Sequence, residues 1–375
     1  MKKNFTLIFF AFVSLAFSQA GAPATPYYNG FNWTLTGMSL KSALETKITS
    51  THTKFLTYAE AEDAIKIIDL DPNDVTNTYL FLVYGFSSNV CTYVSESNFG
   101  NSLDDNDHRR RHKEADSGAQ NCAWNREHTY PRALGTPNLE DNEANADVHH
   151  LRAADVARNG LRDNNKFIDG NGNSFESGIL WYPGDEWKGD VARMMMYMYL
   201  RYGSQCLPTG VAQTGIATAA NDSNMVQLFL EWNAEDPVSQ YEDNRNTYLG
   251  NTANTYAQGN RNPFIDNPYL ATVIWGGPQA ENRWPTVFVL ATDTYALENS
   301  LVYPNPAVNN EVYVTTSTEL KTIILYNVNG QIIQEIKNPS KVENNAYKVS
   351  NLPTGFYIMQ LASENASTIK KLIVN

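Results

Sequence analysis

The segment WNREHTYPRALG, residues 124–135, places a carboxylate beside an imidazole at the end of a short, aromatic-flanked run. Glu127 and His128 are adjacent, and Pro131 follows them closely. Neighbouring side chains of a regular strand point to opposite faces, so this pair can share one site only where a strand ends. We therefore expect a short strand that finishes near His128 and is followed by a turn.

A second segment, DVHHLRAADVARNGLRDNNKF, occupies residues 147–167 after a loop rich in Asn, Asp and Glu. Its residues 148–151 (VHHL) predict a strand, and residues 153–160 (AADVARNG) predict a short helix that stops at Asn159 and Gly160. The expected order is strand, loop, strand, helix. This order can bring His128 opposite Asn159.

These residue types suit the hydrolysis of a phosphodiester. A histidine can take a proton from water near neutral pH, whereas carboxylate and amide oxygens are hard ligands for Mg²⁺ or Ca²⁺. Two other interpretations stay open: a surface Glu–His pair without function, and a zinc site made of His128, His149 and His150.

The two segments, together with QGNRNPFIDNP at residues 258–268, resemble the endonuclease I family of secreted nucleases, which have a ββα-metal (His-Me finger) site. The resemblance runs from roughly Thr78 to Trp275. It implies an endonuclease that cuts DNA, RNA or both with little sequence specificity and leaves 5′-phosphates. The alternative is a non-catalytic surface adhesin or binding protein on a nuclease-like scaffold.

The resemblance also implies roles for individual residues. His128 matches the general base, and Glu127 and Asn159 match the ligands of a single metal ion, expected to be Mg²⁺, with Mn²⁺ or Ca²⁺ as alternatives. Arg132 is the nearest arginine to the place where some members carry a phosphate clamp, so the cation at the transition state is open. Four further positions match family residues: Arg162, expected to contact phosphate; Arg193 and Arg261, with a phosphate or structural role; and His149, expected to be structural.

The two ends of the chain indicate export. Residues 1–18 have Lys2 and Lys3, a short apolar run and small residues near a cleavage site, as in a signal peptide. From residue 301 onward, short strands separated by turns predict a small β-sandwich. Four stretches of this tail resemble the type IX secretion sorting domain: YPNPA (303–307), LYNVNGQII (325–333), LPTGFYIMQL (352–361) and KKLIVN (370–375). An adhesive or carbohydrate-binding module is the alternative for this tail.

We therefore predict an α+β protein with a signal peptide (1–18), a nuclease domain of mixed helices and short strands (19–279), a linker (280–299) and an all-β sandwich (300–375). Its expected partners are nucleic acid and the type IX secretion machinery. The mature protein should be a monomer without a membrane segment, exported through the periplasm and then secreted or held on the outer-membrane surface.

The net charge of the chain limits how the protein can contact nucleic acid. The net charge of 28 − 40 = −12 argues against non-specific coating of nucleic acid, and we interpret the basic run at residues 108–113 as a solvated loop.

Of the three cysteines, Cys91, Cys122 and Cys206, the first two are favoured as a pair. Hydrophobic spacing predicts helices at residues 40–48, 58–70 and 188–203, and another within residues 221–238 that is capped by Asp222 or Ser223 and ends before Pro237. Residues 78–85 predict a buried strand.

Overall fold

The computed structural model describes residues 21–86, 109–116, 123–141, 143–288, 297, 299–342, 346–363 and 366–375. The chain divides into two compact units, Met1–Val287 and Phe288–Asn375, and each is described here by itself. The predicted signal peptide and the favoured Cys91–Cys122 pair lie outside the described residues.

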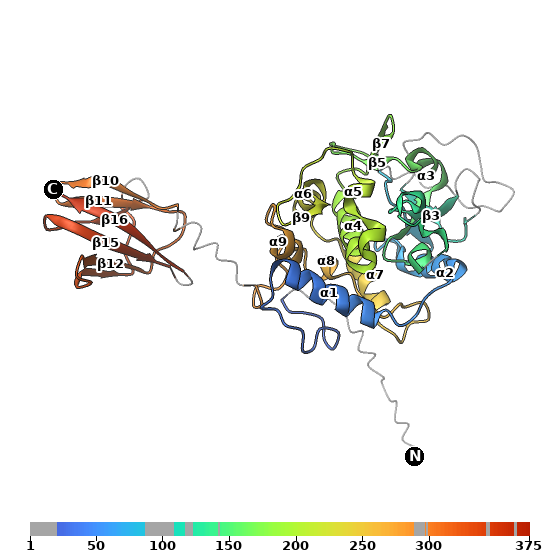
Figure 1. Ribbon diagram of the computed structural model, residues 1–375, viewed down its shortest axis with the longest axis horizontal. Helices are drawn as coiled ribbons and strands as arrows, with labels where there is room; N and C mark the ends of the chain where they lie inside the picture. Colours follow the sequence, from blue (N-terminus) through green and yellow to red (C-terminus); the bar gives the residue numbers. More distant parts are fainter. Residues whose placement is uncertain are drawn as a thin grey trace, which may run out of the picture. The chain divides into compact units, whose positions relative to one another are not determined.

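The first unit mixes helices with short strands, and the predicted α+β class is confirmed (Figure 1). Its helices are α1 (Gly37–Thr51), α2 (Tyr58–Ile68), α3 (Val156–Arg162), α4 (Lys188–Tyr202), α5 (Pro208–Val211), α6 (Gln227–Glu235), α7 (Gln240–Gly250), α8 (Pro263–Asp266) and α9 (Tyr269–Trp275). Its strands are β1 (Tyr79–Phe81), β2 (Arg110–His112), β3 (Trp124–His128), β4 (Leu151–Asp155), β5 (Lys166–Phe167), β6 (Phe175–Ser177), β7 (Leu180–Tyr182), β8 (Thr218–Ala219) and β9 (Asp222–Val226). No described helix has both the length and the hydropathy needed to cross a membrane.

Helix α4 forms the centre of this unit and packs against α1, α5, α6 and α8 (Figure 1). Residues 189–200 are all buried, and the run of methionines within them fills the core, as the hydrophobic spacing predicts. The helix ends at Gly203, whose φ of 56° lies in the left-handed region that favours glycine. The predicted helix at residues 188–203 is confirmed.

Several predicted elements differ from the structure. Residues 222–226 form β9 instead of the start of a helix, so α6 begins only at Gln227. The Asp222 carboxylate lies too far before α6 to cap it, and it accepts hydrogen bonds from Tyr199 Oη, Trp275 Nε1 and the backbone N–H of Asn224. The strand predicted over residues 78–85 is shorter: β1 ends at Phe81, Val83 forms an isolated bridge with Ala154, and Tyr84 has a left-handed backbone with a φ of 70°.

Strands β3 and β4 pair antiparallel, with Glu127 opposite Arg152, and α3 follows β4 directly. The prediction of a strand at residues 148–151 is wrong by three residues. The Asp147 carboxylate accepts a hydrogen bond from the backbone N–H of His149 and thereby holds this stretch in a turn. Asp155 then caps α3, which continues past Gly160 to Arg162.

Residues 280–287, expected in the linker, pack against the first unit. Trp284 is buried, and Arg283 forms a bidentate ion pair with Asp243 at 2.8 Å from both guanidinium nitrogens. The backbone N–H of Gly21 also donates to the Arg283 carbonyl. These contacts join the two ends of the unit.

The second unit is one seven-stranded sheet in the order β13-β12-β15-β16-β10-β11-β14. Strand β10 pairs with β11 on one side and β16 on the other, and its register shifts between Tyr303 and Val308. The sheet curls so that Val312 and Val314 share one core with Met359 and Leu361, and the predicted all-β architecture is confirmed. The bounds are β10 (Leu301–Val308), β11 (Glu311–Thr315), β12 (Thr322–Asn327), β13 (Ile332–Lys337), β14 (Tyr347–Val349), β15 (Gly355–Ala362) and β16 (Ser367–Val374).

Candidate active site

The end of β3 and one face of α3 line a cavity of about 590 Å³. Glu127 and His128, the last two residues of β3, reach it together with Asn159 from α3. The structure thus brings the predicted base and both predicted metal ligands to one place. Twelve other residues complete the lining: Tyr58, Asn125, Arg126, Pro131, Arg132, Ala133, Asn138, Glu140, Val156, Gly160, Asp163 and Asn164.

Two neighbours hold Glu127 by the same oxygen. Tyr84 Oη donates to Glu127 Oε1 at 2.8 Å, and Arg162 Nε lies 3.2 Å from that atom as an ion pair outside hydrogen-bond geometry. Burial raises the pKa of Glu127, whereas Arg162 and the Tyr84 hydroxyl act to lower it. Burial also raises the pKa of Tyr84 far above its usual range, so its phenol stays protonated and donates. Among the described residues, none bonds to Glu127 Oε2.

His128 is held as a neutral imidazole. Its Nε2 lies 3.0 Å from both the backbone carbonyl and the side-chain Oδ1 of Asn145, and its ring stacks on Tyr58 at 5.6 Å. A carbonyl oxygen can only accept, so Nε2 carries the proton and Nδ1 keeps its lone pair. Burial, with a smaller contribution from His150, lowers the pKa of His128 to about 3. The imidazole is therefore neutral at neutral pH and keeps the Nδ1 lone pair, although so low a pKa makes it a weak base.

Asn159 is oriented across the joint between β3 and α3. Its Nδ2 donates to Asn125 Oδ1 at 2.7 Å and lies 3.5 Å from the Arg126 carbonyl. Because the amide nitrogen takes both contacts, Oδ1 is the end left without a partner in the described part of the chain.

The donors at the cavity fit a hard divalent cation. Glu127 Oε2 and Asn159 Oδ1 are both oxygens, the atom type that Mg²⁺, Mn²⁺ and Ca²⁺ prefer. The three-histidine zinc alternative has no support, since His149 Nε2 contacts the Asn260 carbonyl and His150 Nε2 contacts the Ala144 carbonyl. Within the described ranges, no cluster of three His, Cys, Asp or Glu side chains could hold a metal ion.

The three arginines predicted from the resemblance lie outside the cavity lining. Arg162 is fully buried, and its two Nη atoms donate to the carbonyls of Thr129 and Asp163, so the expected phosphate contact does not match its position. Arg162 instead forms an ion pair with the Glu127 carboxylate. Arg193 is also fully buried and forms a bidentate pair with Glu242, and Arg261 is held by Asp266.

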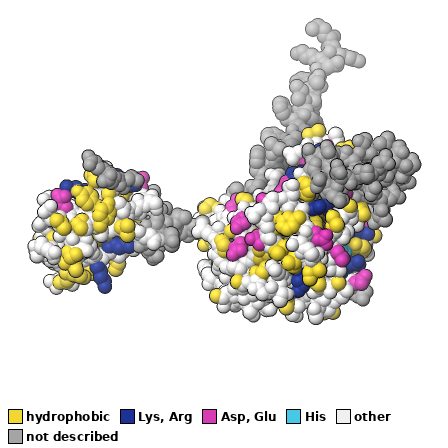
Figure 2. Space-filling model, turned by 90° about the horizontal axis from the view of Figure 1, so that it is seen from above, with side chains coloured by type: hydrophobic (Ala, Val, Ile, Leu, Met, Phe, Trp, Pro, Cys, Tyr) yellow, Lys and Arg dark blue, Asp and Glu magenta, His cyan; other side chains and the backbone are white. Residues whose placement is uncertain are grey.

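Two other arginines do line the cavity. Arg132 is 41% exposed at its side chain and pairs with Glu140 at 3.2 Å. Arg126 lies over the Tyr58 ring and pairs with Glu62 at 2.9 Å. On the face of the nuclease unit seen in Figure 2, acidic side chains lie among scattered basic ones.

Sequence reasoning missed three residues that orient the site: Tyr84, Asn125 and Asn145. Tyr84 and Asn145 are distant from their partners in the chain, and only folding brings them together. Asn125 stands two residues before Glu127. Because side chains two residues apart on a strand point to the same face, the sequence could have placed Asn125 beside the site.

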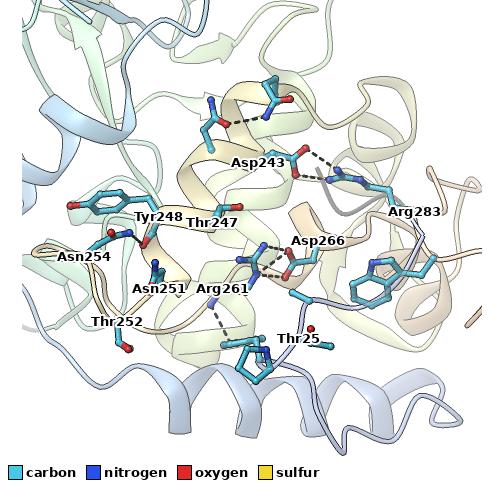
Figure 3. A pocket seen from close by; sticks show the side chains of 17 residues that line it. Thr25, Asp243, Thr247, Tyr248, Asn251, Thr252, Asn254, Arg261, Asp266 and Arg283 are labelled. Atoms are coloured by element: carbon cyan, nitrogen blue, oxygen red, sulfur yellow. Dashed lines mark hydrogen bonds and ion pairs between the residues drawn. The ribbon is translucent and has the colours of Figure 1, made fainter. Parts of the chain in front are cut away.

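A second cavity of about 770 Å³ lies between α7, residues 24–27 and Trp284 (Figure 3). Its arginines are neutralised: Arg261 faces Asp266, and Arg283 faces Asp243. No histidine lines this cavity. It therefore offers neither a base nor a free cation for phosphodiester chemistry.

Two family models match separate parts of the chain. Residues 36–269 match the family model for endonuclease I. The chain belongs to the endonuclease I family. It is accordingly a nuclease, and endonuclease I-like nucleases are generally metal-dependent. Residues 301–375 match the secretion system C-terminal sorting domain, as the tail motifs predict, and make this family member a secreted or surface protein.

Three curated relatives resemble this endonuclease I chain. An extracellular ribonuclease of Bacillus subtilis is 36% identical over 68% of this chain and 82% of its own length. An extracellular ribonuclease of Bacillus amyloliquefaciens is also 36% identical, over 64% of this chain and 74% of its own. A periplasmic deoxyribonuclease of Aeromonas hydrophila is 29% identical over 34% of this chain and 50% of its own.

Proposed function

We propose that this nuclease is a divalent-metal-dependent endonuclease that hydrolyses both RNA and DNA with little base specificity and leaves 5′-phosphates. The observation that carries the proposal is the arrangement at the end of β3. A neutral His128 with a free Nδ1 lies beside two oxygen donors, Glu127 Oε2 and Asn159 Oδ1, whose other atoms are held by protein partners.

His128 is the proposed general base. Asn145 holds Nε2–H, and this contact leaves the lone pair of Nδ1 to accept the proton of the attacking water. Water gives its proton to Nδ1 as its oxygen attacks phosphorus, and the P–O3′ bond breaks to leave the 5′-phosphate. The low pKa of His128 keeps the ring neutral before attack.

Glu127 and Asn159 are the proposed ligands of one cation, with Mg²⁺ as the first choice. When bound, such a cation neutralises negative charge on the phosphate and on the leaving oxygen. Arg132, the more exposed of the two lining arginines, is the proposed phosphate contact. We assign Arg162, Arg193 and Arg261 to positioning and structural roles because of their burial and their ion pairs.

Tolerance of both nucleic acids follows from the lining of the cavity. Each proposed contact addresses the phosphodiester, which carries no sequence information. The resemblance to relatives described as ribonucleases and as a deoxyribonuclease supports action on both sugars.

Cleavage of supercoiled plasmid and of a single-stranded RNA tests the proposal. We expect both substrates to be cut with Mg²⁺, neither with EDTA, and activity to return with excess Mg²⁺. Ends that accept ligation without a kinase step establish 5′-phosphates. Activity that survives EDTA, or that returns only with stoichiometric Zn²⁺, contradicts the proposed ligands. A folded protein that binds nucleic acid and cuts neither substrate is the adhesin alternative.

A further inference from the structure

Tyr84 combines full burial with a backbone conformation that tyrosine rarely adopts. Its φ of 70° lies in the left-handed region, and its side chain has no exposed surface. Such a conformation is strained and persists only where the surroundings impose it. Strained residues of this kind are common at functional sites, so the residues that contact Tyr84 can indicate its role.

Three hydrogen bonds impose the conformation. The backbone N–H of Val83 donates to the Ala153 carbonyl on β4 at 3.0 Å. Ser174 Oγ donates to the Tyr84 carbonyl at 2.6 Å, and Trp187 Nε1 donates to the Gly85 carbonyl at 2.9 Å. The segment is therefore fixed before, at and after the strained residue.

The same segment is linked to both elements that carry the proposed metal ligands. Arg158, the neighbour of Asn159 on α3, donates through Nη2 to the Ser174 carbonyl at 2.7 Å. Ser174 in turn holds Tyr84, whose hydroxyl donates to Glu127 Oε1 on β3. Displacement of Tyr84 would thus disturb Glu127 directly and α3 through one intermediate.

We propose that Tyr84 is a positioning residue that holds the Glu127 carboxylate by Oε1 and so keeps Oε2 available to the cation. Arg162 Nε, 3.2 Å from the same oxygen, is the second support. This role rests on the proposed function, because it presumes that Glu127 binds a cation. A positioning role and a purely structural role have different consequences. If Tyr84 positions Glu127, loss of its hydroxyl should lower the affinity for the metal more than it lowers the stability of the fold.

The test is Tyr84→Phe in the full chain, which removes one oxygen and keeps the ring against Trp181. Tyr199→Phe is the matched control, because Tyr199 Oη also donates to a buried carboxylate, Asp222 Oδ2 at 3.0 Å, and neither residue lines the active-site cavity. Calorimetric titration with Mn²⁺ alone is the primary measurement. We expect Tyr84→Phe to weaken Mn²⁺ binding about 10–100-fold, as is usual for residues that orient metal ligands, and Tyr199→Phe to bind like the wild type.

Kinetics supply a second readout. The Mg²⁺ concentration for half-maximal cleavage should rise about 10–100-fold in Tyr84→Phe, whereas kcat at saturating Mg²⁺ should return close to the wild-type value. If Tyr84→Phe does not fold, Ser174→Ala tests the same support, because it removes the hydrogen bond from Ser174 Oγ that holds the Tyr84 carbonyl. It should show a similar loss of Mn²⁺ affinity.

The outcomes separate this inference from the proposed function. If Glu127→Ala loses Mn²⁺ while Tyr84→Phe, or Ser174→Ala in its place, binds Mn²⁺ like the wild type, the positioning role is wrong and the metal site stands. If the wild-type protein itself binds no Mn²⁺, both proposals are wrong. Equal weakening in Tyr84→Phe and Tyr199→Phe would also overturn the positioning role.

Discussion

Asn125 Oδ1 accepts a hydrogen bond from Asn159 Nδ2 at 2.7 Å, and this contact between β3 and α3 determines which end of the Asn159 carboxamide is left free. The amide nitrogen is engaged, so the oxygen is the atom available to a cation. The hydrogen bond between Asn125 and Asn159 therefore fixes the orientation of the Asn159 oxygen at the place where β3 and α3 meet.

Asn125→Ala should therefore weaken cation binding without unfolding the protein. The half-buried Asn159 would lose the partner that fixes its orientation, and we expect about a 10–100-fold rise in the Mg²⁺ concentration needed for cleavage. Plasmid nicking against Mg²⁺ concentration measures it. Asn165→Ala, at a residue outside the cavity lining, is the control and should cut like the wild type.

His128→Ala and Glu127→Ala should fail in different ways. Loss of the base should lower cleavage by about 10²–10⁴-fold while Mn²⁺ affinity stays at the wild-type level. Loss of the carboxylate should weaken Mn²⁺ binding, and high Mg²⁺ should restore part of the activity. Calorimetry beside cleavage assays distinguishes them. The assigned roles are wrong if His128→Ala is fully active or if it alone loses the metal.

Arginine substitutions should separate phosphate contact from structure. Arg132→Ala should reduce kcat/KM by roughly 10²-fold with little change in melting temperature, because its side chain is partly exposed beside the cavity. Arg193→Ala should instead destabilise the fold by about 3–5 kcal/mol, since it leaves the buried Glu242 carboxylate unpaired. Urea unfolding and kinetics on the folded fraction give both quantities. Normal stability and low kcat in Arg193→Ala would assign it to catalysis.

Stability should fall on acidification because of a buried cluster behind the site. Burial lowers the pKa of His149 to about 4, against the opposing effect of Asp147. The unfolded chain, with a usual histidine pKa near 6.5, then binds the proton first, so stability is complete above about pH 6.5 and declines toward pH 4. The decline from this group is on the order of 3 kcal/mol.

Asp147 extends the decline to lower pH. Burial alone would raise the pKa of Asp147, but His52, His149 and the hydrogen bond from the His149 backbone hold it well below its usual range. Its contribution is therefore present above about pH 4 and is lost as the pH falls further. Urea unfolding at several pH values measures both effects. His149→Gln should flatten the curve between pH 6.5 and 4, and an unchanged slope would rule out His149 as its source.

Removal of the sorting domain should leave the chemistry intact. Because Trp284 and Arg283 pack into the first unit, a chain that ends at Val287 should cut nucleic acid like the full chain, whereas one that ends at Gln279 should be less stable. Specific activity and melting temperature of both truncated proteins check this. A folded but inactive protein ending at Val287 would place part of the active site in the tail.

The amino-acid sequence alone determined the large regular features. Helix α4 follows from unbroken apolar spacing ended by Gly203, and the strands of the tail follow from alternation between turn residues, because these are local patterns. The motif around Glu127 and His128 likewise located the strand end, since it lies within a few residues. Local conformation depends mainly on near neighbours, which the sequence displays directly.

Only the tertiary structure decided what surrounds the reactive groups. Tyr84 reaches Glu127 across 43 positions of sequence, and Asn125 reaches Asn159 across 34. Burial of Arg162 and Arg193, which separates them from the cavity, depends on how helices pack and has no local signature. Strand β9 stands where a helix start was expected, and the Asp222 carboxylate accepts hydrogen bonds from Tyr199 on α4 and Trp275 on α9 as well as from the nearby backbone N–H of Asn224.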